Sequence, residues 1–203
     1  MTTIITILIF LSSYLQNDYF EGGILYDHEF TSSTLDLDSL KAAKSFRSAY
    51  IFKNKYYKGF TFTSDTLFFI YDGESARCLY SRSSQDDVYC YDYSVPDKDD
   101  LKSWRILDEE RTILGHRCKI LEFQYNDYLS KYYFTTELKL DPRVYKTHIA
   151  YDYKKRLELT DGGVTLLSEH IYGDYTMSIR ATKVSSFEVP MEEFQIELFD
   201  GCK

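Results

Sequence analysis

The four cysteines are the residues whose spacing says most about possible chemistry. Cys78, Cys90, Cys118 and Cys202 form no Cys-x-x-Cys pair, so the spacing of a zinc ribbon or a thioredoxin-like site is missing. Two strands around a turn at residues 83–85 would place Cys78 directly opposite Cys90, within reach of a disulfide. The sequence therefore predicts a Cys78–Cys90 disulfide and, by elimination, Cys118–Cys202. The alternative is four buried or free thiols.

The other reactive side chains form no recognisable catalytic group. The four histidines are far apart in the sequence, and none is spaced with Glu or His as a pair of metal ligands. The adjacent carboxylates at 99–100 and 109–110 would point to opposite faces of a strand, so neither pair makes an acid/base dyad. No serine lies in a Gly-x-Ser-x-Gly turn, and residues 162–163 are typical of a hairpin turn. We expect a protein that is not an enzyme and needs no metal or cofactor.

The charge balance is acidic and excludes two classes of partner. The chain carries 24 Lys and Arg against 32 Asp and Glu, a net charge of −8. A nucleic-acid binder needs clustered cations, and docking on anionic lipid headgroups needs them too. The densest cationic group, residues 154–156, is flanked by Asp152 and Glu158. This group is predicted to be a solvated turn or strand end, and nucleic acid is excluded as a partner.

The N-terminus resembles an export signal. Residues 4–15 are mostly apolar, too few to span a bilayer but of the length of a signal-peptide core. No Lys or Arg precedes this run, and a first strand is the alternative interpretation. The sequence predicts a signal peptide over residues 1–18, a single domain over 19–203, and a periplasmic or extracellular location.

The elements that must position these residues are mainly strands. The chain has 20 Tyr, 14 Phe and 1 Trp but only 9 Gly and 3 Pro, and aromatic side chains favour strands. Residues 130–138 alternate as a half-buried strand does, whereas residues 36–50 and the segment after Asp141-Pro142 favour helices. A hairpin is predicted over residues 157–167. The fold class is mainly β: a strongly curved antiparallel sheet, an incomplete barrel, of about ten strands with two or three short helices.

Short motifs in the second half follow one another in a recognisable order. They are Thr112-Ile113-Leu114-Gly115-His116-Arg117-Cys118-Lys119, the strand at 132–138, Pro142, Ala181-Thr182-Lys183-Val184, Pro190 and Phe194. In this order they resemble the GLPGLI-type secreted envelope proteins of Gram-negative bacteria over residues 104–198. The Gly-Leu-Pro-Gly-Leu-Ile motif itself is absent, and residues 162–164 stand near its expected place.

That family is similar to the LolA-like superfamily of lipoprotein carriers. The resemblance implies a curved antiparallel sheet with helices across its open side. Known members of the superfamily hold acyl chains in the apolar concavity. Carriage of a lipid is therefore what the resemblance implies for this chain.

Large apolar residues on alternating strand positions are the candidates for such a concave face. They are Phe68, Ile70, Leu121, Phe123, Tyr132, Phe134, Met177 and Ile179. The sequence predicts an exported cell-envelope protein, a monomer, that binds an apolar ligand, a lipid or an acyl chain. The alternative is an envelope interaction or structural protein that binds a protein partner through a tyrosine-rich surface, since tyrosine gives a large contact area with a polar tip.

Overall fold

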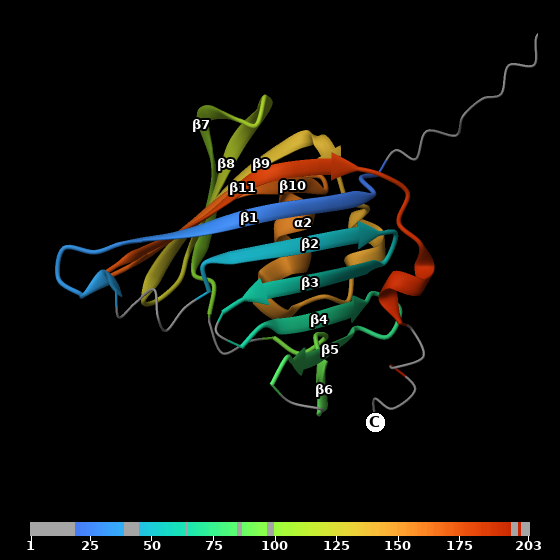
Figure 1. The fold of residues 1–203 in the computed structure, drawn as a ribbon. Helices are drawn as coiled ribbons and strands as arrows, with labels where there is room; N and C mark the ends of the chain where they lie inside the picture. The colour runs from blue at the N-terminus through green and yellow to red at the C-terminus, as the bar shows by residue number, and fades with distance from the viewer. Residues whose placement is uncertain are drawn as a thin grey trace, which may run out of the picture.

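Eleven antiparallel strands form a single sheet in the computed structural model (Figure 1). The structure describes residues 19–38, 45–63, 65–84, 87–96, 100–195 and 199. The first six strands are β1 (Gly22–Thr31), β2 (Arg47–Lys53), β3 (Tyr56–Phe62), β4 (Leu67–Asp72), β5 (Arg77–Arg82) and β6 (Val88–Asp92). The other five are β7 (Ser103–Ile113), β8 (His116–Gln124), β9 (Tyr128–Lys139), β10 (Gly163–Tyr172) and β11 (Thr176–Ser186). The predicted signal peptide lies outside the described residues.

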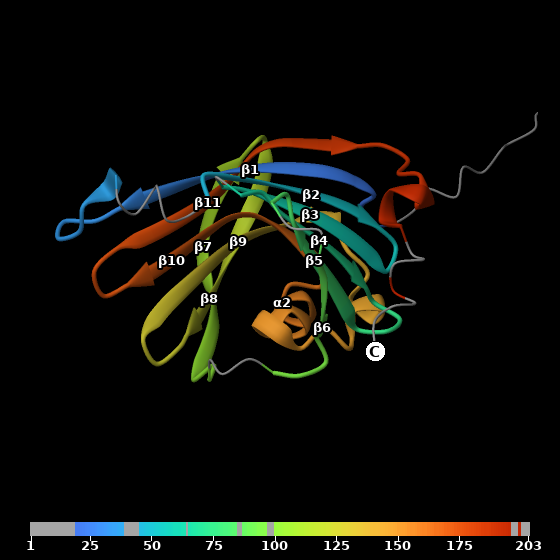
Figure 2. The same cartoon turned by 60° about the horizontal axis from the view of Figure 1, so that its bottom comes forward.

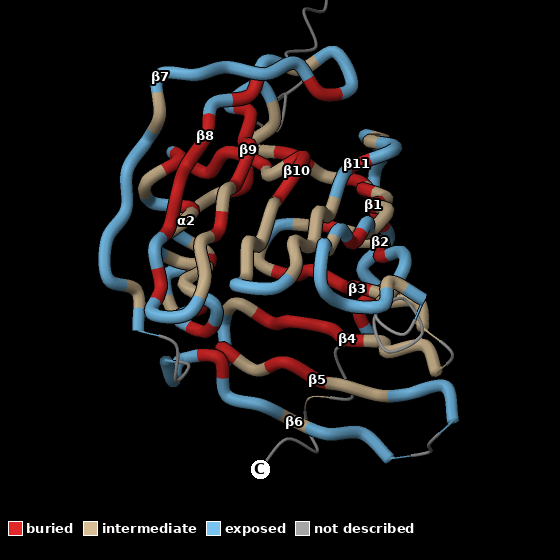
Figure 3. Tube along the Cα trace, turned by 90° about the vertical axis from the view of Figure 1, so that its left-hand side faces the viewer, coloured by how far each residue is buried: buried red, intermediate tan, exposed pale blue. Residues whose placement is uncertain are grey.

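Two meanders make up this sheet, and they join where the first strand meets the last. The order is β6-β5-β4-β3-β2-β1-β11-β10-β9-β8-β7, so only the β1–β11 pair brings together strands distant in the sequence. Within the described part of the chain, β6 and β7 each have one neighbour, and their exposed edges stand out in Figure 3. The predicted mainly β fold on one antiparallel sheet is confirmed, with eleven strands in an open sheet.

The two faces of the sheet are covered by different segments. The sheet arches over the helix α2 (Tyr153–Leu159), as Figure 2 shows. Two 3-10 turns, η1 (Pro142–Tyr145) and η2 (Ala150–Asp152), lead from β9 into α2. On the opposite face, Val189 and Phe194 from the C-terminal segment, which includes the turn η3 (Met191–Phe194), pack on Tyr56 and Ile70.

Local sequence signals explain several element boundaries. Gly115 has a φ of 85° in the two-residue turn between β7 and β8, a conformation that glycine adopts without steric cost. Asp141 caps η1 by accepting a hydrogen bond from the backbone N–H of Arg143 at 3.0 Å, with Pro142 in the first position. The helical segment expected after Asp141-Pro142 therefore begins where the sequence predicts it, as the 3-10 turn η1.

Two predicted elements are wrong in part. A helix is expected over residues 36–50. Of these, residues 37–38 are helical, residues 39–44 lie outside the described part of the chain, and residues from Arg47 onward form the strand β2. Residues 157–159, expected to be a hairpin strand, form the end of α2. Short apolar runs do not distinguish a strand from a buried helix turn, and here Tyr153 and Leu157 share one face of the helix at i, i+4 spacing.

The predicted disulfides Cys78–Cys90 and Cys118–Cys202 are also wrong. Cys78 lies opposite Tyr91 and Cys90 lies opposite Leu79, so the true register differs by one residue from the expected one. Because side chains alternate along a strand, this shift puts Cys78 and Cys90 on opposite faces of the sheet. Cys78 and Cys118 are free, buried thiols, and Cys202 lies outside the described residues.

Both buried thiols are expected to resist alkylation in the folded protein. Burial raises the pKa of Cys78 to about 12 and that of Cys118 to about 11, so the reactive thiolate is scarce at about pH 8. Iodoacetamide followed by peptide mass spectrometry should leave both unlabelled in native protein and label both in guanidinium chloride. Equal labelling of either cysteine in the two conditions would contradict the burial.

A candidate ligand-binding cavity

A cavity of about 690 Å³ lies between the concave face of the sheet and α2. Its walls come from β1 to β5, from β9 to β11 and from α2, together with the segment before the helix. This volume is within the range of about 300–1,000 Å³ in which small-molecule sites are found. The fold therefore leaves room for a ligand of moderate size.

Tyrosine dominates the cavity wall. Different elements contribute Tyr26, Tyr50, Tyr57, Tyr80, Tyr132 and Tyr153. Burial raises the pKa of Tyr26, Tyr50 and Tyr153 above the usual value, so these phenols stay neutral. The hydroxyl of Tyr26 donates to the backbone carbonyl of Thr165 at 2.8 Å, which satisfies its polar end. The wall consequently offers flat aromatic faces without charge.

Asp152 and Arg156 are the only Asp, Glu, Lys or Arg residues in the wall, counting the described residues alone. Tyr125 donates a hydrogen bond from its hydroxyl to Asp152 Oδ2 at 3.0 Å. The guanidinium of Arg156 lies over two rings, with its Cζ 4.7 Å from the ring centre of Tyr132 and 4.9 Å from that of Tyr153. Within the described part of the chain, Arg156 forms no ion pair.

Two histidines in the wall are neutral. His148 is 1% exposed, and its Nε2 lies 2.7 Å from the hydroxyl of Tyr57. His170 contacts Ser130 through Nδ1 at 2.8 Å and Ser168 through Nε2 at 3.2 Å. Burial and, second, the nearby Arg156 lower the pKa of His148 to about 3 and that of His170 to about 4. Arg156 is therefore the one cation in the wall near neutral pH, as far as the structure describes it.

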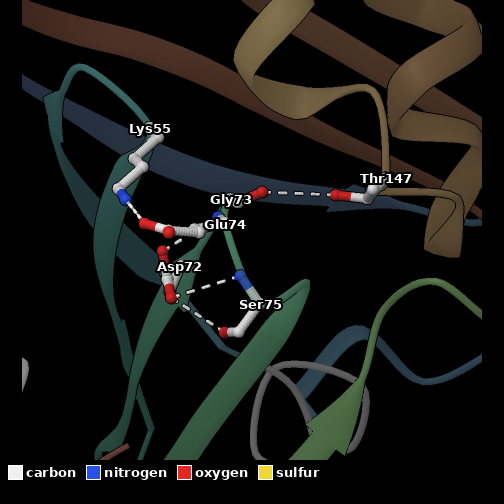
Figure 4. A network of polar contacts seen from close by, with 6 residues as sticks. All are labelled: Lys55, Asp72, Gly73, Glu74, Ser75 and Thr147. Carbon is white, nitrogen blue, oxygen red and sulfur yellow. Dashed lines mark hydrogen bonds and ion pairs between the residues drawn. The ribbon is translucent and has the colours of Figure 1, made fainter.

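The segment that carries His148 is anchored to the β4–β5 turn (Figure 4). Thr147 donates from Oγ1 to the carbonyl of Gly73 at 3.3 Å, and the Gly73 N–H donates to the carbonyl of Lys55 at 2.9 Å. Asp72 orders the same turn by accepting hydrogen bonds from the backbone N–H of Glu74 at 2.9 Å and from the Ser75 hydroxyl at 2.8 Å. These contacts fix the chain directly before α2.

The entry to α2 uses an uncommon backbone conformation. Tyr151 and Asp152 have φ values of 58° and 51°, which side-chain-bearing residues seldom adopt. Directly after them, the N–H of Lys154 donates to the carbonyl of His148 at 2.8 Å. Because the chain reverses sharply here, α2 runs along the concave face, and Arg156 and Leu157 line the cavity.

Of the residues predicted to lie on the concave face, some line the cavity and others do not. Tyr132, Met177 and Ile179 line the cavity. Leu121, Phe123 and Phe134 share the face of Tyr132 but pack into a closed cluster with Tyr125. Phe68 and Ile70 lie on the opposite face, under the C-terminal segment, so the expected placement does not hold for them. Their strand is apolar at every position, and such a run does not reveal which side faces the cavity.

Sequence reasoning missed Arg156 and His148. The cationic group 154–156, flanked by Asp152 and Glu158, is predicted to be a solvated turn or strand end, yet it belongs to α2, which turns Arg156 inward while Lys155 stays exposed. The available signal was its spacing of three residues from Tyr153, which puts both on one helix face. His148 had no sequence signal, because only tertiary packing brings Tyr57 to it.

Two other kinds of site are absent from the described part of the chain. No group of three or more His, Cys, Asp or Glu among the described residues could hold a metal ion. No helix in that part of the chain is long and apolar enough to cross a membrane.

Comparison with known proteins identifies a shared fold. No family model matches the sequence, and no curated protein matches it. Two solved structures of PNGF-II are similar: one has a TM-score of 0.52 at 11% identity over 86% of this chain, the other 0.53 at 12% over 90%. In both cases the match covers 30% of the PNGF-II chain. At this identity the likeness shows that the chain shares the fold of part of PNGF-II, and nothing about activity.

Proposed function

We propose that this protein is an exported, non-enzymatic binding protein that holds an apolar ligand, a lipid or an acyl chain, between its sheet and α2. The cavity of about 690 Å³ with its largely aromatic wall is the observation that carries the proposal. The resemblance to LolA-like carriers supports it, because those proteins hold acyl chains in the same kind of concavity. Tyr132, Met177 and Ile179 are the predicted contact residues that line this space.

Blocking the cavity is expected to abolish ligand binding. A neutral fluorescent probe, N-phenyl-1-naphthylamine, should bind the wild-type protein with one-to-one stoichiometry and gain fluorescence. The double variant M177W/I179W places two indoles in the cavity and should weaken binding at least about tenfold, or about 1.4 kcal/mol. The measurement is a fluorescence titration, with the fold of each variant checked by circular dichroism.

The matched control for this experiment lies on the same strand. Ser178 stands between Met177 and Ile179, and its side chain points to the other face of the sheet. S178W should therefore keep the wild-type affinity for the probe. Equal weakening in S178W and M177W/I179W, or no binding by folded wild-type protein, would contradict the proposal. Native mass spectrometry of protein from its own host should show a bound ligand.

A second candidate function rests on the edge of the sheet near β6. Tyr89, Tyr91, Val95 and Tyr151 are exposed there and line a neighbouring cavity of about 670 Å³. An envelope protein partner that binds this tyrosine-rich edge would be recovered by crosslinking from the host. Loss of the crosslink in Y89S/Y91S, with probe binding retained, would favour this candidate.

A further inference from the structure

We infer that the ligand is an organic anion, an apolar body carrying a carboxylate that pairs with Arg156. The inference rests on the proposed function, because it assigns the chemical class of the ligand held in the same cavity. It is carried by the one cation of the described wall, which forms no ion pair with a carboxylate of the described residues.

The nearby acidic groups are engaged elsewhere. Asp152 accepts the hydroxyl of Tyr125, and Glu158 on the same helix lies 3.8 Å from Lys154. A charge drawn out of water without a partner is costly, so such groups in proteins are normally paired. Arg156 is thus a cation that the described residues leave without a counter-ion inside an aromatic cavity.

The two rings that flank Arg156 leave part of its hydrogen-bonding edge for a ligand. Tyr132 and Tyr153 each meet the guanidinium within 5 Å, an arrangement in which the ring faces attract the cation. Guanidinium N–H groups lie in the plane of the group and form a fork that matches the two oxygens of a carboxylate. Ring contacts of this kind hold the side chain in place, and Tyr132 also takes one side-chain hydrogen bond from Arg156, so the other N–H groups of the fork are left for a ligand.

The described remainder of the wall is largely aromatic, which favours contact with the apolar part of such a ligand. It provides no second cation for the carboxylate. His148 and His170 are neutral, for the reasons given above, and the tyrosines are uncharged. A carboxylate would therefore be recognised by Arg156, and the apolar part would lie against tyrosine faces. The shared chemistry fits either a fatty acid or a flat aromatic acid, which the experiment separates.

The test compares carboxylates with neutral amides of the same shape. Decanoate and decanamide form one pair, and 2-naphthoate and 2-naphthamide form the other. Each compound displaces N-phenyl-1-naphthylamine from the wild-type protein in a competition titration. At least one carboxylate should bind about tenfold or more tightly than its amide. A larger difference for the decanoate pair would indicate a fatty acid as the ligand, and a larger difference for the naphthoate pair would indicate an aromatic acid.

Variants on α2 connect this preference to Arg156. R156Q should bind the carboxylate and the amide equally, and R156K should keep part of the preference because it keeps the charge. Lys155 is exposed beside Arg156, so K155Q makes the same change of charge outside the cavity and should behave as wild type. Circular dichroism and probe binding verify that each variant is folded.

Two outcomes would overturn the inference, and they differ from failure of the proposed function. Equal affinity for carboxylate and amide in wild-type protein that still binds the probe overturns the anion assignment alone. Full retention of the preference in folded R156Q overturns the role of Arg156. Absence of binding by every compound and by the probe would overturn the proposed function itself.

Discussion

Replacing Phe194 with alanine is expected to lower the free energy of unfolding by about 3–5 kcal/mol, the usual cost of removing a fully buried phenylalanine. The ring is 0% exposed and lies 5.5 Å from that of Tyr56, with Ile70 and Val189 in the same cluster. It covers the outer face of β3 and β4. Truncation leaves a cavity there and loosens the segment that shields the sheet.

Polar contacts beside Phe194 are expected to weaken with it. Lys58 donates to both the carbonyl and a carboxylate oxygen of Glu193 at 3.0 Å, and Glu21 accepts a hydrogen bond from the backbone N–H of Val189 at 2.7 Å. These bonds depend on the position of the same segment. The loss in F194A is therefore expected in the upper part of the range.

Urea denaturation followed by circular dichroism measures this change. The matched control is Phe187, a phenylalanine of the same C-terminal region whose side chain is 48% exposed. F187A should change the free energy of unfolding by about 0.5 kcal/mol or less, as surface substitutions usually do. Similar midpoints for F194A and the wild type would show that the segment does not cover the sheet in solution.

Mild acid is the second condition with a large expected effect, and it acts through His148. The folded state holds this histidine neutral with a pKa of about 3, whereas a histidine in the unfolded chain has a pKa of about 6.5. The unfolded state therefore gains a proton first as the pH falls. Stability is complete above about pH 6.5, declines toward about pH 3, and is lower by about 2 kcal/mol at pH 5 from this residue alone.

Comparing H148Q with the wild type isolates that contribution. Glutamine can still hydrogen-bond with Tyr57, so the variant should be less stable near pH 7.5 but lose about 2 kcal/mol less on going to pH 5. The burial of His170 adds a decline in the same direction. The measurement is urea denaturation at both pH values.

The control for acid lability is His116, at the surface of β8, where its Nδ1 lies 2.7 Å from Glu137. H116Q leaves both buried histidines in place, so the acid-induced loss should remain. An unchanged pH dependence in folded H148Q would contradict the assignment to His148.

The sequence by itself determined those features that depend on neighbouring residues. Alternation of Tyr132 and Phe134 with their neighbours placed β9, since side chains of a strand alternate between its faces. Gly115 and the Asp141-Pro142 pair marked a turn and a helix start through backbone preferences that act within a few residues. The composition also placed the chain in the mainly β class.

Only the tertiary structure decided which faces and which distant segments meet. Phe68 and Phe69 are equally apolar, yet Phe69 lines the cavity and Phe68 lies under the C-terminal segment. A shift of one residue in the β5–β6 register separated Cys78 from Cys90, and the helical rather than extended backbone after Asp152 turned Arg156 inward. These outcomes depend on contacts between segments that are far apart in the sequence, as in the β1–β11 pair. The free energy that favours one arrangement comes from burying the apolar face of the whole sheet, so a local sequence pattern does not predict it.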